Sequence, residues 1–91
     1  MARIVDMVAH RLGIPPEKLE REAIEMWIRH RLALIETEIA EILNKYSVSS
    51  VEELEELIHR GKVAEHPTWE DLIVLERLIE EKKKLTEVLR L

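Results

Sequence analysis

The side chains that could bind a metal ion in this sequence are its histidines and its many carboxylates. No two histidines are four residues apart, and the one Glu-x-x-His element joins Glu56 to His59. Carboxylate-bridged di-iron bundles use two such elements together with two further inward Glu residues. A chain this rich in Glu is expected to contain one match by chance. We therefore predict no metal site and no cofactor at the four histidines, which are His10, His30, His59 and His66.

The candidate nucleophiles are three serines that lie together where helix caps are needed, Ser47, Ser49 and Ser50. No Gly-x-Ser-x-Gly motif surrounds any of them. The two glycines, Gly13 and Gly61, are far apart, so they cannot form a Gly-rich phosphate loop. The chain has no Cys, which excludes disulfides and thiolate metal sites. These patterns predict a protein that is not an enzyme and that has no catalytic residues.

A small basic cluster, Arg29-His30-Arg31, could contact nucleic acid, because basic side chains displace counterions from phosphates. Arg3 and Arg11 could lie near it and would extend the basic footprint. A dimer would double this footprint across a two-fold axis, as operator binding requires. The alternative is that Arg29 pairs with Glu25 one helical turn back and that Arg31 is solvated.

The segment from His66 to Leu72 carries the most distinctive candidate for protein recognition. Thr68 is predicted to cap a helix, and Trp69 falls on its first turn. Trp is enriched among the residues that dominate binding energy at interfaces. Trp69, Leu72 and Leu75 are therefore the predicted partner-binding residues. The alternative is that Trp69 covers the join between the third and fourth helices, and Trp27 is likewise better explained by core or dimer packing.

The elements that position these residues are predicted to be long packed helices. Charged residues make up 36% of the 91 residues and aromatic residues 3%, with no Phe. This composition is typical of helical proteins, and 91 residues form one domain. The absence of Gln and the single Asn, together with abundant Glu, Lys and Arg, favour a heat-adapted source.

The main predicted element is a helix over residues 16–45, which contains no Gly and no internal Pro. Six apolar residues within and just after it follow the alternating spacing of four and three that is typical of a coiled-coil seam. A helix of ~30 residues is ~45 Å long, whereas a compact chain of this size is ~30 Å across. The exposed seam needs cover, and the simplest cover is a second copy. The predicted dimer interface is Ile28, Leu32, Ile35, Ile39, Ile42 and Tyr46.

Three shorter helices are predicted around the long one. Residues 3–12 form the first, with Ile4, Val8 and Leu12 on one side and Gly13 as C-cap, although an extended start is an open alternative. The next helix runs to residue 60, with Val51, Leu54, Leu57 and Ile58 inward. Its capping box pairs either Ser49 with Glu52 or Ser50 with Glu53. The last helix runs to the end of the chain.

Charge is distributed unevenly along the sequence. Residues 1–46 contain seven Lys or Arg and eight Asp or Glu, a net charge of −1, whereas residues 47–91 contain seven and eleven, a net charge of −4. The acidic half suits a basic partner. No apolar run approaches the ~20 residues that cross a bilayer, and the first residues do not form a signal peptide. A cytoplasmic protein without membrane contact is therefore expected.

Two stretches resemble small archaeal antitoxins of the VapB-like kind. Residues 11–24, in which a Leu-Gly-Ile turn leads into a Glu-rich helix, resemble the helix-turn-helix portion of small antitoxins. Residues 49–54 and 61–71 resemble the C-terminal part of small archaeal antitoxin-like proteins. The resemblance covers about half of the chain. It implies an N-terminal half that dimerises and contacts operator DNA, and a C-terminal half that binds a basic, RNA-handling toxin.

These observations predict an all-α bundle of about four helices that forms a homodimer through its long central helix. Residues 1–91 are a single helical domain, with a dimerisation half (1–46) and an acidic partner-binding half (47–91). The expected function is that of an antitoxin-like interaction protein. The alternatives are a small DNA-binding regulator that uses Arg3, Arg11, Arg29 and Arg31, and a structural bundle. The pattern leaves open whether the dimer is parallel or antiparallel.

Overall fold

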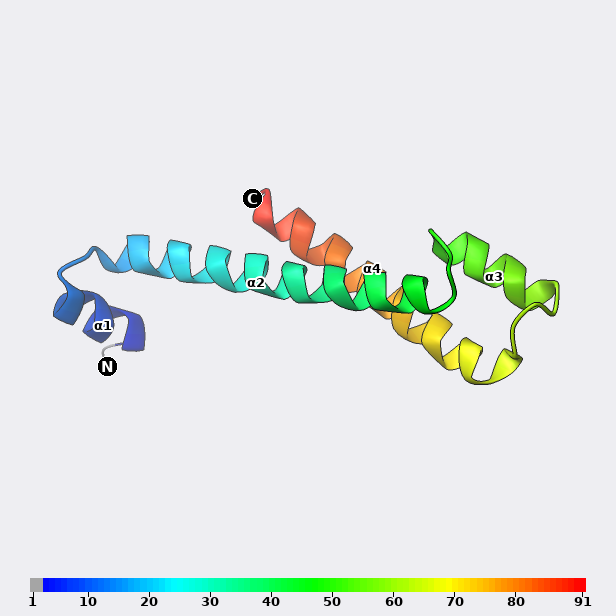
Figure 1. The fold of residues 1–91 in the computed structure, drawn as a ribbon. Coiled ribbons are helices and arrows are strands. Elements are labelled where there is room, and N and C mark those ends of the chain that lie inside the picture. The colour runs from blue at the N-terminus through cyan, green and yellow to red at the C-terminus, as the bar shows by residue number, and fades with distance from the viewer. Residues whose placement is uncertain (1–2) are drawn as a thin grey trace. The chain divides into compact units, whose positions relative to one another are not determined.

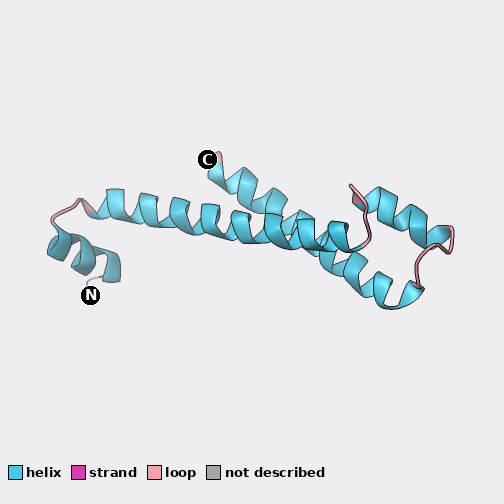
Figure 2. Cartoon of the chain, in the orientation of Figure 1, coloured by secondary structure: helices cyan, strands magenta, loops and turns pink. Residues whose placement is uncertain are grey.

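The computed structural model describes residues 3–91 as an all-α chain (Figures 1 and 2). It confirms the predicted fold class, with four helices, one of them long, and no strand within the described range. The N-terminus is helical from Ile4 onward, which settles the alternative of an extended start. The helices are α1 (Ile4–Leu12), α2 (Pro16–Lys45), α3 (Val51–His59) and α4 (Glu65–Leu89).

The helices belong to two compact units, residues 1–31 and residues 32–91. The boundary falls inside α2, so the first unit contains α1 and the N-terminal part of α2. The second unit contains the C-terminal part of α2 together with α3 and α4. The two units are joined by a continuous helix.

The helix ends are fixed by local backbone geometry. α1 stops at Gly13, which has φ 70°, and the N–H of Ile14 donates to the carbonyl of Ala9 at 3.0 Å. This is the Schellman arrangement, and its left-handed position is one that glycine adopts without a steric penalty. The predicted cap at Gly13 is confirmed. α2 ends in the same way at Ser47, with φ 55° and a bond from Val48 N–H to Leu43 O of 3.0 Å.

The start of α3 matches one of the two predicted capping boxes. The Ser50 hydroxyl accepts from Glu53 N–H at 3.1 Å. In return, the Glu53 carboxylate accepts from the backbone N–H of Ser49 at 2.7 Å. Two N–H groups at the start of the helix are thus satisfied, as helix termini require.

The start of α4 differs from the prediction. The helix is bounded at Glu65, with Ala64 at the N-cap and a non-helical His66 just inside. Thr68, predicted to cap the helix, is not the N-cap and is buried, with 2% of its surface accessible. Its methyl and hydroxyl groups therefore belong to the packed side of α4.

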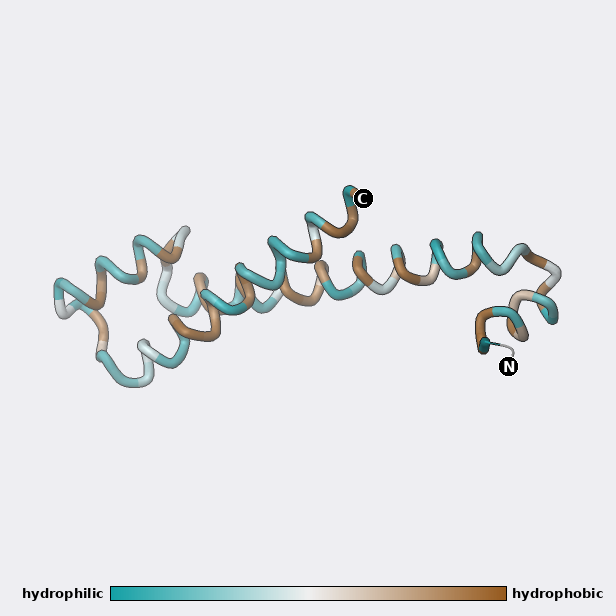
Figure 3. Tube along the Cα trace, turned by 180° about the vertical axis from the view of Figure 1, so that it is seen from behind, coloured by the Kyte–Doolittle hydropathy of each residue, from teal (hydrophilic) through white to brown (hydrophobic). Residues whose placement is uncertain are grey.

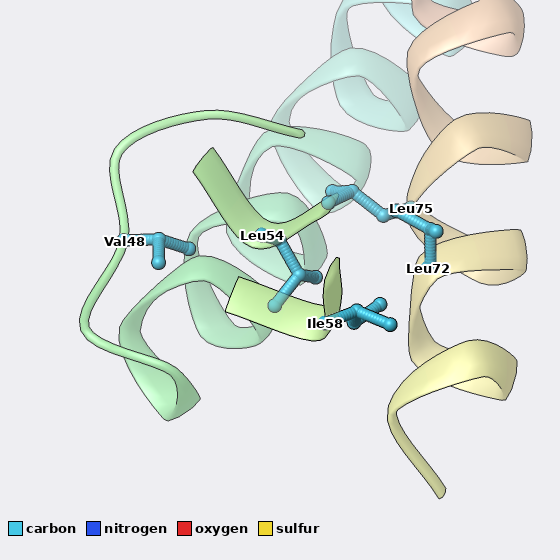
Figure 4. Close-up of a cluster of buried hydrophobic side chains, with 5 residues drawn as sticks. All are labelled: Val48, Leu54, Ile58, Leu72 and Leu75. Atoms are coloured by element: carbon cyan, nitrogen blue, oxygen red, sulfur yellow. The ribbon is translucent and has the colours of Figure 1, made fainter. Parts of the chain in front are cut away.

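The core lies in the second unit, where α3 and α4 pack together (Figure 4). Leu54 and Ile58 of α3 point toward Leu72 and Leu75 of α4. Val48, in the loop between α2 and α3, completes the cluster. This confirms Leu54 and Ile58 as inward residues. The partly buried residues that pack against the cluster are Ile39, Ile42, Leu43, Tyr46, Val51, Leu57 and Val63.

Candidate interaction surfaces

The predicted dimer seam is largely covered within the chain itself. Ile28 and Ile35 are buried, and Leu32 is half-buried. Ile39, Ile42 and Tyr46 pack against the core cluster of the second unit. The seam therefore does not need a second copy to cover it, and the argument for a dimer cannot rest on it.

Exposed apolar side chains gather instead in the first unit. In α1, Ile4, Val8 and Leu12 were predicted to share one side of the helix, and all three are exposed, Ile4 by 79% and Leu12 by 63%. Figure 3 shows α1, near the N-terminus, with apolar segments along its length. The residue that α1 does bury is Ala9. A small side chain permits close approach of the helix backbone to its neighbour, whereas the larger residues lie on another side of the helix.

The N-terminal part of α2 adds to this exposed surface. Residues 21–27 are all exposed, which is nearly two full turns with no covered side. Ile24 lies four residues before Ile28, so it continues the seam toward the N-terminus, and Trp27 is 60% exposed beside it. We define the N-terminal apolar surface as Ile4, Met7, Val8, Leu12, Ile24 and Trp27.

One contact within the first unit orders this surface. Arg3, just before α1, donates to the Glu20 carboxylate of α2 at 3.0 Å. That contact holds the start of α1 beside the turn that precedes Ile24. A shallow concavity of about 310 Å³, lined by Met7, Val8, Arg11 and Leu12, opens on α1.

Two of the four arginines predicted to contact nucleic acid are paired with carboxylates. Arg3 contacts Glu20 at 3.0 Å and also approaches Asp6 at 3.9 Å. Arg29 contacts Glu25 at 2.9 Å, which confirms the predicted pair one turn apart. Of the other two, Arg11 lines the concavity on α1 and Arg31 is half-buried. Ion pairing with acidic neighbours reduces the positive potential that these arginines offer to phosphates.

The predicted partner-binding residues divide between core and surface. Leu72 and Leu75 belong to the buried cluster of the second unit, at 3% and 0% exposure. They hold α4 to α3 and are not available to a partner. Trp69 is exposed by 43%, so it alone of the three is accessible to a partner.

A polar cluster that was not predicted joins α2 to α4. The Asp71 carboxylate accepts from Lys45 Nζ at 2.8 Å and from the Tyr46 hydroxyl on the same oxygen. Lys45 also lies over the Tyr46 ring, 5.4 Å from its centroid. Hydrogen bonds from Lys45 and Tyr46 lower the pKa of Asp71, and the bond to Asp71 raises the pKa of Lys45.

The described residues contain no cluster of side chains that could bind a metal ion. Within residues 3–91, no three His, Cys, Asp or Glu side chains are placed to hold a metal ion. The nearest histidine–carboxylate pair is His66 Nδ1 with Glu70 Oε1, at 2.7 Å on the surface of α4. No described helix is long and apolar enough to cross a membrane.

Comparison with known proteins identifies the family of the chain. The family described as "Uncharacterized protein MJ0235 family" matches residues 1–91, so the chain belongs to it. No curated protein and no solved structure matches the chain.

Proposed function

We propose that this member of the MJ0235 family is a non-enzymatic interaction protein that forms a homodimer through its N-terminal apolar surface. The observation that carries the proposal is the exposure of six large apolar side chains on the first unit. Within residues 3–31, only Ala9 and Ile28 are buried. The first unit therefore has little core of its own and much apolar surface to cover.

Elementary energetics favours association of such a unit. Domains below ~40 residues rarely bury enough surface to be stable and usually rely on metals, disulfides or oligomerisation. The chain has no Cys, and its described residues offer no metal centre. Each Å² of apolar surface removed from water contributes about 25 cal/mol. Covering the N-terminal apolar surface is the remaining way to stabilise the unit.

The charge of the first unit supports a second copy as the cover. Residues 1–31 contain six Lys or Arg and five Asp or Glu, a net charge of +1. Residues 32–91 contain eight and fourteen, a net charge of −6. Two first units can approach without like-charge repulsion, whereas the second units repel one another. A two-fold contact between first units also lets the same patch serve both partners.

The test is the mass of the full chain in solution, measured by light scattering after size exclusion over a range of concentrations. We expect about twice 10.7 kDa. Ile24→Ser with Trp27→Ser should weaken the dimer by at least about 2 kcal/mol, the loss typical of a central interface Trp. Because both side chains are exposed in the single chain, this variant is expected to keep its helical circular dichroism.

Met26→Ser is the matched control. Met26 lies between the two residues, is 66% exposed and points to another side of α2, where it borders a hollow with Glu22, Glu25 and Arg29. The control should remain dimeric. A wild-type chain that is monomeric at every concentration, or a double variant that dimerises as well as the wild type, contradicts the proposal.

An antitoxin is the finer form of this proposal. It is supported by the resemblance of residues 11–24 to small antitoxins and by the acidic second unit, which suits a basic toxin in the cytoplasm. The test is co-expression with the protein encoded beside it. Growth arrest by that neighbour alone, relieved by this chain, is the expected result. A harmless neighbour removes the antitoxin form and leaves the homodimer standing.

A further inference from the structure

The outward side of α4 carries a second apolar patch that is separate from the N-terminal apolar surface. Trp69 is 43% exposed and Ile73 is 48% exposed. They are four residues apart, so their side chains are neighbours on the helix surface. Leu72 and Leu75 are buried and hold the helix to the core. We call Trp69 and Ile73 the outer patch.

The charges around the outer patch are mainly negative. Glu70 follows Trp69 directly, while Glu76 and Glu80 lie three and seven residues beyond Ile73, on the same side of α4. All three are exposed. Arg77 is the basic residue of this side, and Glu70 contacts the exposed His66 imidazole at 2.7 Å. The unit as a whole has a net charge of −6, so the patch lies in a negative field.

The negative charge around the outer patch indicates which kind of partner can bind there. A second copy would bring two units of net charge −6 together, and their mutual repulsion disfavours that contact. A partner with an apolar side chain set among Lys and Arg would bury Trp69 and match the negative rim. Trp is a residue type that dominates binding energy when it is buried at an interface. Charge complementarity adds specificity and speeds association.

We infer that the outer patch of α4 binds a basic protein partner that presents an apolar side chain ringed by Lys and Arg. This binding goes beyond the proposed homodimer and uses a different surface. The dimer would place two outer patches in one assembly, and each patch would bind its own partner molecule.

The probe is a synthetic amphipathic helical peptide of Leu and Lys, and its twin carries Glu in place of every Lys. Calorimetric titration into the full chain measures binding at low salt and at 0.5 M NaCl, where surface charges are screened. The basic peptide is expected to bind, the acidic twin is not, and salt should weaken the complex. The Trp69 indole N–H signal should shift in NMR spectra while that of Trp27 stays in place.

Trp69→Ala with Ile73→Ser is the decisive variant, and Val88→Ser is its matched control. Val88 is also on α4, and its exposed fraction of 47% is close to the 48% of Ile73. We expect the double variant to bind the basic peptide at least tenfold more weakly and the control to bind it like the wild type. Equal binding by all three chains would show that charge alone holds the peptide and would overturn the inference, as would no binding by the wild type.

The same variant separates this inference from the proposed dimer. Its mass by light scattering should equal that of the wild-type chain, because the outer patch is not part of the N-terminal apolar surface. If Trp69→Ala with Ile73→Ser dissociates the dimer, the outer patch is a contact between copies and the inference fails.

Discussion

Tyr46 at the end of α2 donates its hydroxyl to Asp71 on α4, 25 residues away in the chain. Lys45 reaches the same carboxylate oxygen at 2.8 Å. The three side chains fix α4 against the end of α2, next to the core where Tyr46 also packs. Because charged partners strengthen a hydrogen bond, this cluster is a strong polar link between the two helices, which the ion pair of Lys82 with Glu36 also joins at 3.7 Å.

The Asp71 link predicts a specific acid sensitivity. Its pKa is lowered in the folded chain, so the unfolded chain takes up the proton first as pH falls. The stability contributed by Asp71 is therefore complete above its ordinary pKa of about 4 and is lost as pH falls through the lower folded value. Asp71→Asn should be less stable than the wild type at pH 7, and this difference should shrink between pH 5 and pH 3. Urea unfolding followed by circular dichroism measures it.

Glu76→Gln provides the comparison for that titration. Glu76 is an exposed carboxylate on the same helix, so its substitution removes one negative charge from α4 and leaves the bonds from Lys45 and Tyr46 to Asp71 in place. If Asp71→Asn and Glu76→Gln have the same pH profile, the bonds from Lys45 and Tyr46 do not stabilise the ionised carboxylate.

The end of α2 predicts a stabilising substitution. Ser47 has φ 55°, a left-handed conformation that costs a side-chain-bearing residue about 1 kcal/mol relative to glycine. Ser47→Gly should therefore raise the free energy of unfolding by about 1 kcal/mol. Ser49→Gly is the control, because Ser47 is the one non-glycine residue with positive φ within residues 3–91. A loss of stability in Ser47→Gly would mean that α2 ends differently.

Adjacent residues of α2 should respond very differently to truncation. Ile35 is fully buried, whereas Leu34 is 45% exposed. Ile35→Ala should lower the free energy of unfolding by roughly 2–5 kcal/mol, the range for a large aliphatic residue in a packed core. Leu34→Ala should change it by about 0.5 kcal/mol or less, as surface substitutions do. Urea denaturation of the two variants and the wild type is the measurement. Equal losses of stability would contradict a structure in which α2 buries Ile35 and exposes Leu34.

Local features of the sequence predicted local features of the structure. Pro16 begins the long helix and Gly13 ends the first, because proline and glycine restrict or extend the backbone wherever they occur. The Ser50–Glu53 capping box and the inward residues of α3 follow from spacing over one or two turns. Each of these predictions depends on neighbours within about four residues.

Tertiary features were less accessible to sequence reasoning. Periodicity identified the seam of α2 but not what covers it, and the packing of α3 and α4 against Ile39 and Ile42 removed the premise for a dimer there. The spacing of Ile4, Val8 and Leu12 placed them on one side of α1, but it did not indicate that all three are exposed and that Ala9 is the buried residue. The hydrogen bond from Tyr46 to Asp71 joins residues 25 positions apart, and no local sequence pattern predicts it.

The connection between α1 and α2 consists of Gly13, Ile14 and Pro15, which can span at most about 10 Å. A partner that dissociates from α1 while it stays bound to α2 therefore remains close to α1. Such tethering gives the second contact an effective concentration in the millimolar range. The two helices act as one bivalent binding site. The residence time of the partner therefore depends on both contacts breaking at once, and it falls steeply when either contact is removed.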